Sequence, residues 1–221
     1  MRALAEQDFR PAASPQPLPD EEIHLWFFPQ WSGPSRGAAE SAPVRQLLAG
    51  YAGLEAAELA FARNEHGKPR LANATLEFNL SHSGDALLIA LSKTQALGVD
   101  LEMPRRPRPV LELAGRYFDP DEAAALAALP LLAQQQAFLR VWACKEAVLK
   151  AHGGGISLGL ELVTFALDSA GAVTALVSTH GALGSSTWQV VTLALGGGCG
   201  ALAWRGTEVR LQAYTPSWRD V

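Results

Sequence analysis

The segment Val141-Trp142-Ala143-Cys144-Lys145-Glu146-Ala147-Val148-Leu149-Lys150 decides how the rest of the chain is interpreted. Its apolar pattern begins near Leu131, and the run Gly153-Gly154-Gly155 follows it. Glycine is the usual residue just past a helix end, so the pattern predicts a helix that stops there.

One face of this helix combines aromatic and charged side chains. Residues four apart share a face, and they place Phe138, Trp142, Glu146 and Lys150 in one row. The aromatics indicate that the row points into the protein, where charges are costly unless they are paired or bind a metal. Glu146 and Lys150 are therefore either a weak surface ion pair or reactive groups at the edge of a cleft.

Composition limits the classes of protein to which the chain can belong. The chain has 221 residues, is 48% hydrophobic and has a net charge of −4, so nucleic acid is not expected as a partner. Its two cysteines, Cys144 and Cys199, do not suggest a disulfide framework. Neither a signal peptide nor an apolar run of about 20 residues is apparent. We therefore expect a cytoplasmic protein that does not enter the membrane.

Helix and strand patterns divide the chain into short elements. The proline-rich start predicts an unstructured lead-in over residues 1–20. Apolar periodicity and turn signals predict strands at 24–28, 76–80, 86–91 and 97–102, and helices at 41–51, 110–117 and from 120 through the Ala-Leu run. After Gly155, segments 160–167, 173–177, 188–195, 200–204 and 208–214 are typical of a meander of strands.

The strand predicted at 97–102 carries two acidic side chains on one face. Side chains alternate along a strand, so Asp100 and Glu102 point the same way. Neighbouring carboxylates repel each other unless a cation lies between them. Mg²⁺ is the natural candidate, because it prefers hard oxygen ligands and binds one or two carboxylates together with substrate phosphates. The alternative is an exposed strand face.

Other polar segments have two interpretations each. The basic turn His66–Arg70 is either a solvated loop or an anion site, and His82 is either an anion donor or a histidine satisfied within its turn. The basic segment 104–109 is a linker or a patch for an acidic partner. Asp119 and Glu122 form a capping box at a helix start, which already explains Glu122.

Four of these segments are specific only when they are taken together. They are Gly67-Lys68-Pro69, Phe78-Asn79-Leu80-Ser81-His82-Ser83, Gly98-Val99-Asp100-Leu101-Glu102 and Trp142–Lys150. In this order and spacing the chain resembles, over roughly residues 36–155, the 4′-phosphopantetheinyl transferases of the surfactin-synthetase-activating type. The resemblance implies an α+β fold of two similar halves with the active site in the cleft between them. We expect these halves at residues 21–95 and 96–221.

The resemblance also implies a reaction. The phosphopantetheine arm of coenzyme A would move to a serine hydroxyl of an acyl or peptidyl carrier protein, and adenosine 3′,5′-bisphosphate would leave. Asp100, Glu102 and Glu146 would bind Mg²⁺, for which Mn²⁺ is a possible substitute. Glu146 is then the leading candidate for the base, Lys150 would neutralise the diphosphate and assist proton transfer, and Glu122 matches a second acid. Because the cleft would form within one chain, we expect a monomer.

The same resemblance assigns a site for the 3′-phosphate of coenzyme A. Lys68 and His82 would contact it, with Ser81 beside them and Arg36 joining them. Members of the family usually have a longer N-terminal half with a basic segment before that arginine. Residues 29–35 contain no lysine, so we expect a weaker grip on this phosphate than a full-length member shows.

Two further functions stay open. The shortened N-terminal half suits a catalytically weak protein that only binds coenzyme A or a carrier protein, although the acidic residues and Lys150 argue for an enzyme. A magnesium-dependent phosphodiesterase is the other, but no residue obviously positions a water. Carrier recognition should need an apolar surface with positive charge, for which the candidates are Arg105, Arg106, Arg108 and Arg116.

Overall fold

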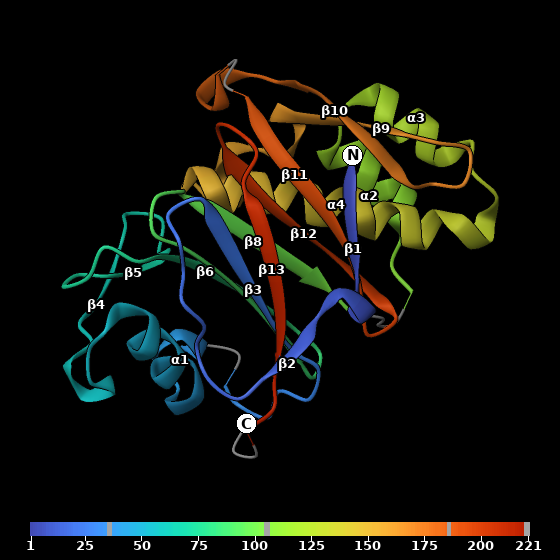
Figure 1. The fold of residues 1–221 in the computed structure, drawn as a ribbon. Coiled ribbons are helices and arrows are strands. Elements are labelled where there is room, and N and C mark those ends of the chain that lie inside the picture. Colours follow the sequence, from blue (N-terminus) through green and yellow to red (C-terminus); the bar gives the residue numbers. More distant parts are fainter. Residues whose placement is uncertain (35–36, 104–106, 185–186, 219–221) are drawn as a thin grey trace.

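Two β-sheets packed face to face, each with a helix on its outer side, form the body of the protein (Figure 1). The computed structural model describes residues 1–34, 37–103, 107–184 and 187–218. The five-stranded sheet has the order β2 (Arg10–Ala12), β13 (Arg210–Pro216), β3 (Glu22–Phe28), β7 (Ala86–Ser92) and β6 (Glu77–Ser83). The four-stranded sheet has the order β1 (Arg2–Ala5), β11 (Trp188–Leu195), β12 (Gly198–Arg205) and β8 (Leu97–Glu102).

Helices and two small hairpins surround these sheets. The helices are α1 (Ala42–Ala52), α2 (Val110–Tyr117), α3 (Pro120–Ala127) and α4 (Leu131–His152), and the hairpins are β4 (Phe61–Arg63) with β5 (Pro69–Leu71) and β9 (Val163–Leu167) with β10 (Val173–Thr179). Figure 1 shows α1 and α4 on opposite sides of the molecule. No helix in the described residues has the length and apolar character that crossing a membrane requires.

Three apolar cores follow from the two-sided burial of the sheets. Leu25 and Phe27 of β3 pack against Val99 of β8 and Leu202 of β12 in the core between the sheets. A second core lies between the five-stranded sheet and α1, and a third between the four-stranded sheet and α4. Strands buried on both faces explain why the apolar runs at 86–91 and 97–101 show so few polar residues.

A row of polar side chains links the two sheets where β6 passes β8. Alternate residues of β6 point toward β8 and accept hydrogen bonds from its free backbone N–H groups. The pairs are Val99 N to Asn79 Oδ1 at 2.8 Å, Leu101 N to Ser81 Oγ at 3.2 Å and Met103 N to Ser83 Oγ at 3.0 Å. We call these three contacts the inter-sheet ladder. It satisfies the outer edge of β8, which would otherwise carry unpaired donors.

Most predicted elements are confirmed. The helix at 110–117 has the expected bounds, and α3 begins with the expected capping box at Asp119 and Glu122. The long helix ends at Gly153, whose φ of 92° lies in the left-handed region that favours glycine. The strands at 24–28, 76–80, 86–91 and 97–102 all appear; their ends lie within two residues of the expected positions, except that the second strand runs three residues further, to Ser83.

Two predictions about the ends of the chain are wrong. Residues 1–20 are not an unstructured lead-in, because β1 pairs in parallel with β11 and β2 pairs in parallel with β13. The predicted meander is also broken, because β9 and β10 form a separate two-stranded sheet and the last strand, β13, leaves β12 and pairs in parallel with β3. The N-terminal strand β1 thus joins the four-stranded sheet, and the C-terminal strand β13 joins the five-stranded sheet. Local sequence patterns do not reveal such long-range pairings.

Candidate active site

Helix α4 lies directly on β8, and Gly98 makes this approach possible. A Cβ atom at this position would lie 2.2 Å from the carbonyl oxygen of Ala147 and 2.3 Å from the backbone nitrogen of Ala151. The neighbouring strand β12 places the small residues Ala203 and Ala201 opposite Gly98 and Asp100. The helix axis therefore lies unusually close to this sheet. The side chains of Asp100 and Glu102 are on the same face of β8 as Gly98, so they point toward the helix.

Lys150, Asp100 and Ser81 form the centre of the site. The Lys150 Nζ donates to Asp100 Oδ1 at 2.6 Å and lies 3.3 Å from Ser81 Oγ. The Ser81 hydroxyl donates to the same Asp100 oxygen at 2.9 Å. The other oxygen, Asp100 Oδ2, is buried and has no hydrogen-bond partner in the structure. Such a buried acceptor needs a partner, which a bound cation or a water molecule would supply.

Glu146 is a buried carboxylate beside this centre. It is 5% exposed, so the surface ion pair with Lys150 is excluded, and Lys150 pairs with Asp100 instead. Burial raises the pKa of Glu146 to about 7, with Lys150 lowering it and Asp100 and Glu102 raising it further. A carboxyl group with this pKa can exchange a proton near neutral pH.

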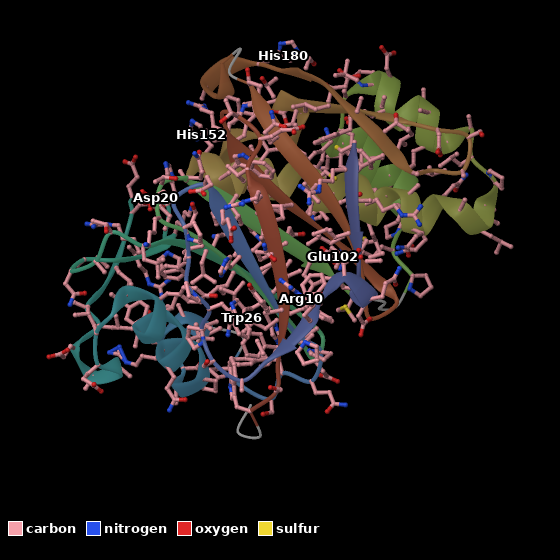
Figure 2. All side chains as sticks on the ribbon, viewed as in Figure 1. Arg10, Asp20, Trp26, Glu102, His152 and His180 are labelled. Atoms are coloured by element: carbon pink, nitrogen blue, oxygen red, sulfur yellow. The ribbon has the colours of Figure 1, made fainter. Side chains whose placement is uncertain are left out.

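Glu102 completes the acidic group at the carboxyl end of β8. Figure 2 labels Glu102 on this strand and His152 at the last residue of α4, so the strand and the helix run in opposite directions. The guanidinium Nη2 of Arg108 lies 3.4 Å from Glu102 Oε2. Asp100 and Glu102 both lie close enough to Glu146 to raise the pKa of its carboxyl group.

The acidic residues suit a hard cation in their chemistry. Across the described ranges, no three His, Cys, Asp or Glu side chains stand ready-made as a metal cluster. The orphaned Asp100 Oδ2 and the buried Glu146 carboxylate are nevertheless the oxygen donors that Mg²⁺ prefers. In the structure Lys150 provides the positive charge that Asp100 requires.

A cavity of about 270 Å³ opens beside the carboxylates, lined by Glu146, Lys150 and the turn at residues 66–69. Lys68, predicted to bind the 3′-phosphate, lies in its wall. Its Nζ donates to the carbonyl oxygens of Leu97 and Lys150, both at 2.9 Å. Burial lowers the pKa of Lys68, so an anion in the cavity would favour its charged form.

Ser81 and His82, also predicted at this phosphate, lie side by side on β6 but point to opposite faces of the strand. The Ser81 side chain contacts Asp100. Arg36, Arg105 and Arg106 lie outside the described residues. The roles predicted for Arg36 and His82 stay predictions.

Glu122, the second acid expected near the metal, has a complete set of structural partners. Its Oε2 lies 2.6 Å from Lys145 Nζ in an ion pair whose two side chains are buried. Its Oε1 accepts from the Phe165 backbone N–H at 2.6 Å, and its Oε2 accepts from that of Asp119 at 3.1 Å. These contacts join α3, α4 and β9, and they explain both Glu122 and its lysine partner.

Asn64 is a positioning residue that sequence reasoning missed. Its Oδ1 accepts from the backbone N–H groups of His66 and Lys68, at 3.0 and 2.8 Å, and its Nδ2 donates to the Gly153 carbonyl at 2.8 Å. It therefore ties the basic turn to the end of α4. The signal was available, since asparagine commonly bonds to the backbone two residues ahead in a turn.

Comparison with known proteins identifies a similar family over the segment that holds most of these residues. Residues 96–203, which contain Asp100, Glu102, Glu146 and Lys150, match the family model of the 4′-phosphopantetheinyl transferase superfamily. Over this segment, just under half of the chain, the protein is similar to that superfamily.

Among its relatives is the 4′-phosphopantetheinyl transferase HetI of Nostoc sp. strain PCC 7120, which is 40% identical over 146 residues. The 4′-phosphopantetheinyl transferase Sfp of Bacillus subtilis strain 168 is 31% identical over 150 residues. These alignments cover 64% and 66% of this chain, and 60% and 65% of the two relatives. The chain therefore spans less than two thirds of either relative.

Proposed function

We propose that this chain transfers the 4′-phosphopantetheine arm of coenzyme A to a serine hydroxyl of an acyl or peptidyl carrier protein. The observation that carries the proposal is a cavity whose wall presents Glu146, Lys150 and Lys68, with Asp100 paired to Lys150 directly behind it. Asp100, Glu146 and Lys150 lie inside the segment that matches the transferase superfamily. The arrangement supplies cations for a diphosphate and a carboxylate that can accept a proton.

The chemistry is a displacement at phosphorus. The serine oxygen of the carrier protein forms a bond to the phosphorus next to the pantetheine arm, and the bond from that phosphorus to the bridging oxygen breaks. Adenosine 3′,5′-bisphosphate leaves with that oxygen. Glu146, the leading candidate for the base, accepts the serine proton. Lys150 lies against the diphosphate and offsets the charge that develops on the leaving group.

Asp100, Glu102 and Glu146 would hold the metal ion, for which Mg²⁺ is the first candidate and Mn²⁺ the second. When bound, the ion would neutralise the diphosphate and polarise its oxygens. The support from the structure is the orphaned Asp100 Oδ2 beside a second buried carboxylate. Lys150 would then turn from Asp100 toward the substrate, which a lysine side chain on its flexible stem can do.

We also propose that the two sheets are the cores of two similar halves that meet at the site. Each sheet carries a helix on its outer face, and the cavity is lined by residues 66–80 and 146–156 from either side of residue 95. All of these residues belong to one chain, which supports a monomer. The buried, unpaired thiols Cys144 and Cys199 support a cytoplasmic location.

Intact mass spectrometry tests the function directly. An apo carrier protein is incubated with the chain, coenzyme A and Mg²⁺, beside a Glu146→Gln control. We expect the carrier to gain one phosphopantetheine arm with the wild type and not with the variant. No gain with several carriers, while coenzyme A still binds, would favour the binding protein. Free phosphopantetheine without a carrier would favour the phosphodiesterase.

Exposed leucines at the opposite end of α4 from Lys150 support a carrier-binding surface. Leu131 and Leu132 are 80% and 96% exposed at the start of α4. One turn further on, Gln135 Oε1 accepts from the backbone N–H of Arg108 at 3.3 Å, and the Arg108 side chain reaches Glu102. We propose that the apolar surface of Leu131 and Leu132, together with Arg108 and Arg116, binds the acidic carrier protein.

The surface is tested by exchanging its apolar residues for polar ones. We expect Leu131→Ser with Leu132→Ser to raise KM for the carrier protein and to leave KM for coenzyme A unchanged. Val177→Ser on β10 is the matched control, because Val177 is also an exposed apolar residue, at 61%. Equal effects on both KM values, or an equal effect of the control, would refute this surface.

A further inference from the structure

We propose that Ser81 is a positioning residue that fixes the metal-binding carboxylate of Asp100, and that it is not a ligand of the 3′-phosphate of coenzyme A. The inference deepens the proposed function and rests on it. It comes from the hydroxyl's hydrogen bonds, from its place in the inter-sheet ladder, and from the face of β6 on which it lies.

The Ser81 hydroxyl has no donor left for a phosphate. A serine hydroxyl offers one donor and two acceptor positions. Its hydrogen goes to Asp100 Oδ1 at 2.9 Å, and its lone pairs accept from Leu101 N at 3.2 Å and from Lys150 Nζ at 3.3 Å. Donating to a phosphate would therefore break the contact with Asp100, and the buried side chain of Ser81 has no other polar group.

These contacts determine which oxygen of Asp100 remains open. Ser81 and Lys150 both donate to Oδ1, whereas Oδ2 is buried and unpartnered. If Lys150 turned toward a diphosphate, Ser81 would be the remaining side chain that holds Oδ1. A hydrogen-bonded carboxylate has a fixed orientation, and such outer partners of metal ligands are important for metal affinity.

The contact also links the geometry of the site to the packing of the two sheets. Ser81 belongs to β6 of the five-stranded sheet and Asp100 to β8 of the four-stranded sheet. The N–H of Leu101, next to Asp100, holds the hydroxyl from the other side. A change in the relative position of the two sheets would therefore move the Asp100 carboxylate.

Ser83 provides a matched control within the same ladder. It accepts from Met103 N at 3.0 Å, as Ser81 accepts from Leu101 N, but it makes no recorded contact with Asp100. A change at Ser83 removes one hydroxyl and one ladder bond while the carboxylate keeps its partner. A comparison of the two serines thus separates the positioning of Asp100 from the general effect of weakening the ladder.

The test measures metal and coenzyme A binding separately in the full chain. Free Mn²⁺ is followed by electron paramagnetic resonance with saturating coenzyme A. We expect Ser81→Ala to raise the Kd for Mn²⁺ about 10–100-fold, the usual cost of losing an outer partner. Ser83→Ala should keep the wild-type Kd, and Ser81→Thr, which retains the hydroxyl, should restore it. Calorimetry without metal should show unchanged affinity for both coenzyme A and 3′-dephospho-coenzyme A.

Three results would overturn the inference while leaving the proposed function intact. These are an unchanged Mn²⁺ Kd in Ser81→Ala, an equal loss in Ser83→Ala, and a loss of affinity for coenzyme A without one for 3′-dephospho-coenzyme A, which marks a phosphate ligand. A wild-type chain that binds no Mn²⁺ with coenzyme A would instead refute the metal site itself. If Ser81→Ala does not fold, Ser81→Cys, whose thiol donates weakly, carries the same expectation.

Discussion

The backbone of Ala147 covers Gly98 so closely that no side chain fits between them. The carbonyl oxygen of Ala147 would lie 2.2 Å from a Cβ at Gly98, far inside van der Waals contact. The obstacle is backbone, which cannot move aside as a flexible side chain can. This contact sets the height of α4 above β8, and with it the distance between Lys150 and Asp100.

We therefore expect Gly98→Ala to destabilise the protein by about 3 kcal/mol, in the upper part of the usual range for overpacking. Transfer should also slow, because the helix that carries Glu146 and Lys150 must shift. Gly115→Ala is the control, since Gly115 lies in α2 with open space around it. Alanine there should stabilise by about 0.5–1 kcal/mol through its higher helix propensity. Urea denaturation measures both, and equal stabilities would contradict the close packing of α4.

The buried pair of Lys145 and Glu122 should behave as one unit. Removing one partner leaves a buried charge, so Lys145→Met and Glu122→Gln should each cost about 3 kcal/mol or more. The double variant should lose clearly less than the sum, because neither charge is then stranded. Strict additivity in urea denaturation would show that the two groups do not depend on each other.

The folded double variant also tests the catalytic role predicted for Glu122. Its contacts to Lys145, Phe165 and Asp119 are structural. Transfer measured by intact mass in a stable double variant decides between the roles. A folded but inactive variant would support the second acid, whereas an active one would assign Glu122 to the fold alone.

The sequence predicted the reactive helix and strand well because their signals are local. The row with Phe138 and Glu146 and the alternation at Asp100 and Glu102 both follow from simple periods of helix and strand. Ser81 shows where this reasoning stops. Its motif suggested a phosphate ligand, but its partners come from β8, some twenty residues away, and a sequence period cannot reveal a contact between two sheets.

The pairing of β1 with β11 and of β13 with β3 was missed for a related reason. Parallel pairing between distant segments leaves no turn signal between the strands. The lead-in also contains prolines, which favour irregular structure, yet Pro11 lies in the short edge strand β2, where proline is tolerated. Tertiary pairing thus overrode local composition at both ends of the chain.

His24 should make stability depend on pH. It is fully buried, with Nδ1 2.8 Å from the Tyr51 hydroxyl and Nε2 3.2 Å from Glu22 Oε2. Its ring packs against Tyr214, which also packs against Trp26, the residue labelled in Figure 2. Burial lowers its pKa, an effect that Glu22 opposes and Arg10 assists. Below the ordinary histidine pKa of about 6.5, the unfolded chain therefore binds more protons than the folded one.

Stability should consequently fall on acidification through this window, by at most about 1.4 kcal/mol per pH unit for one proton. His24→Gln should be less stable than the wild type at pH 7.5, because it loses aromatic and hydrogen-bonding contacts. The difference between the two proteins should shrink toward pH 5.5, since only the wild type carries this penalty. A difference that grew on acidification would mean that Glu22 raises the pKa of His24 more than burial lowers it.

The buried carboxylate of Glu146 should lower the free energy of unfolding of the metal-free protein. Burial is the main reason why its pKa is raised from 4.5 to about 7. At about 1.4 kcal/mol per pKa unit, ionising this carboxyl at pH 8 costs the folded chain about 3 kcal/mol.

In buffer with EDTA, Glu146→Gln should therefore be more stable than the wild type by about 1–3 kcal/mol at pH 8. The gain should shrink as pH falls from 7 to 4.5, because the folded wild type then keeps its proton. With coenzyme A already present, adding Mg²⁺ should stabilise the wild type more than the variant. Urea titrations at pH 8 and pH 5 measure each step. A variant that is less stable than the wild type at pH 8 would mean that Lys150 and the surrounding dipoles already satisfy this carboxylate, and that it needs no cation.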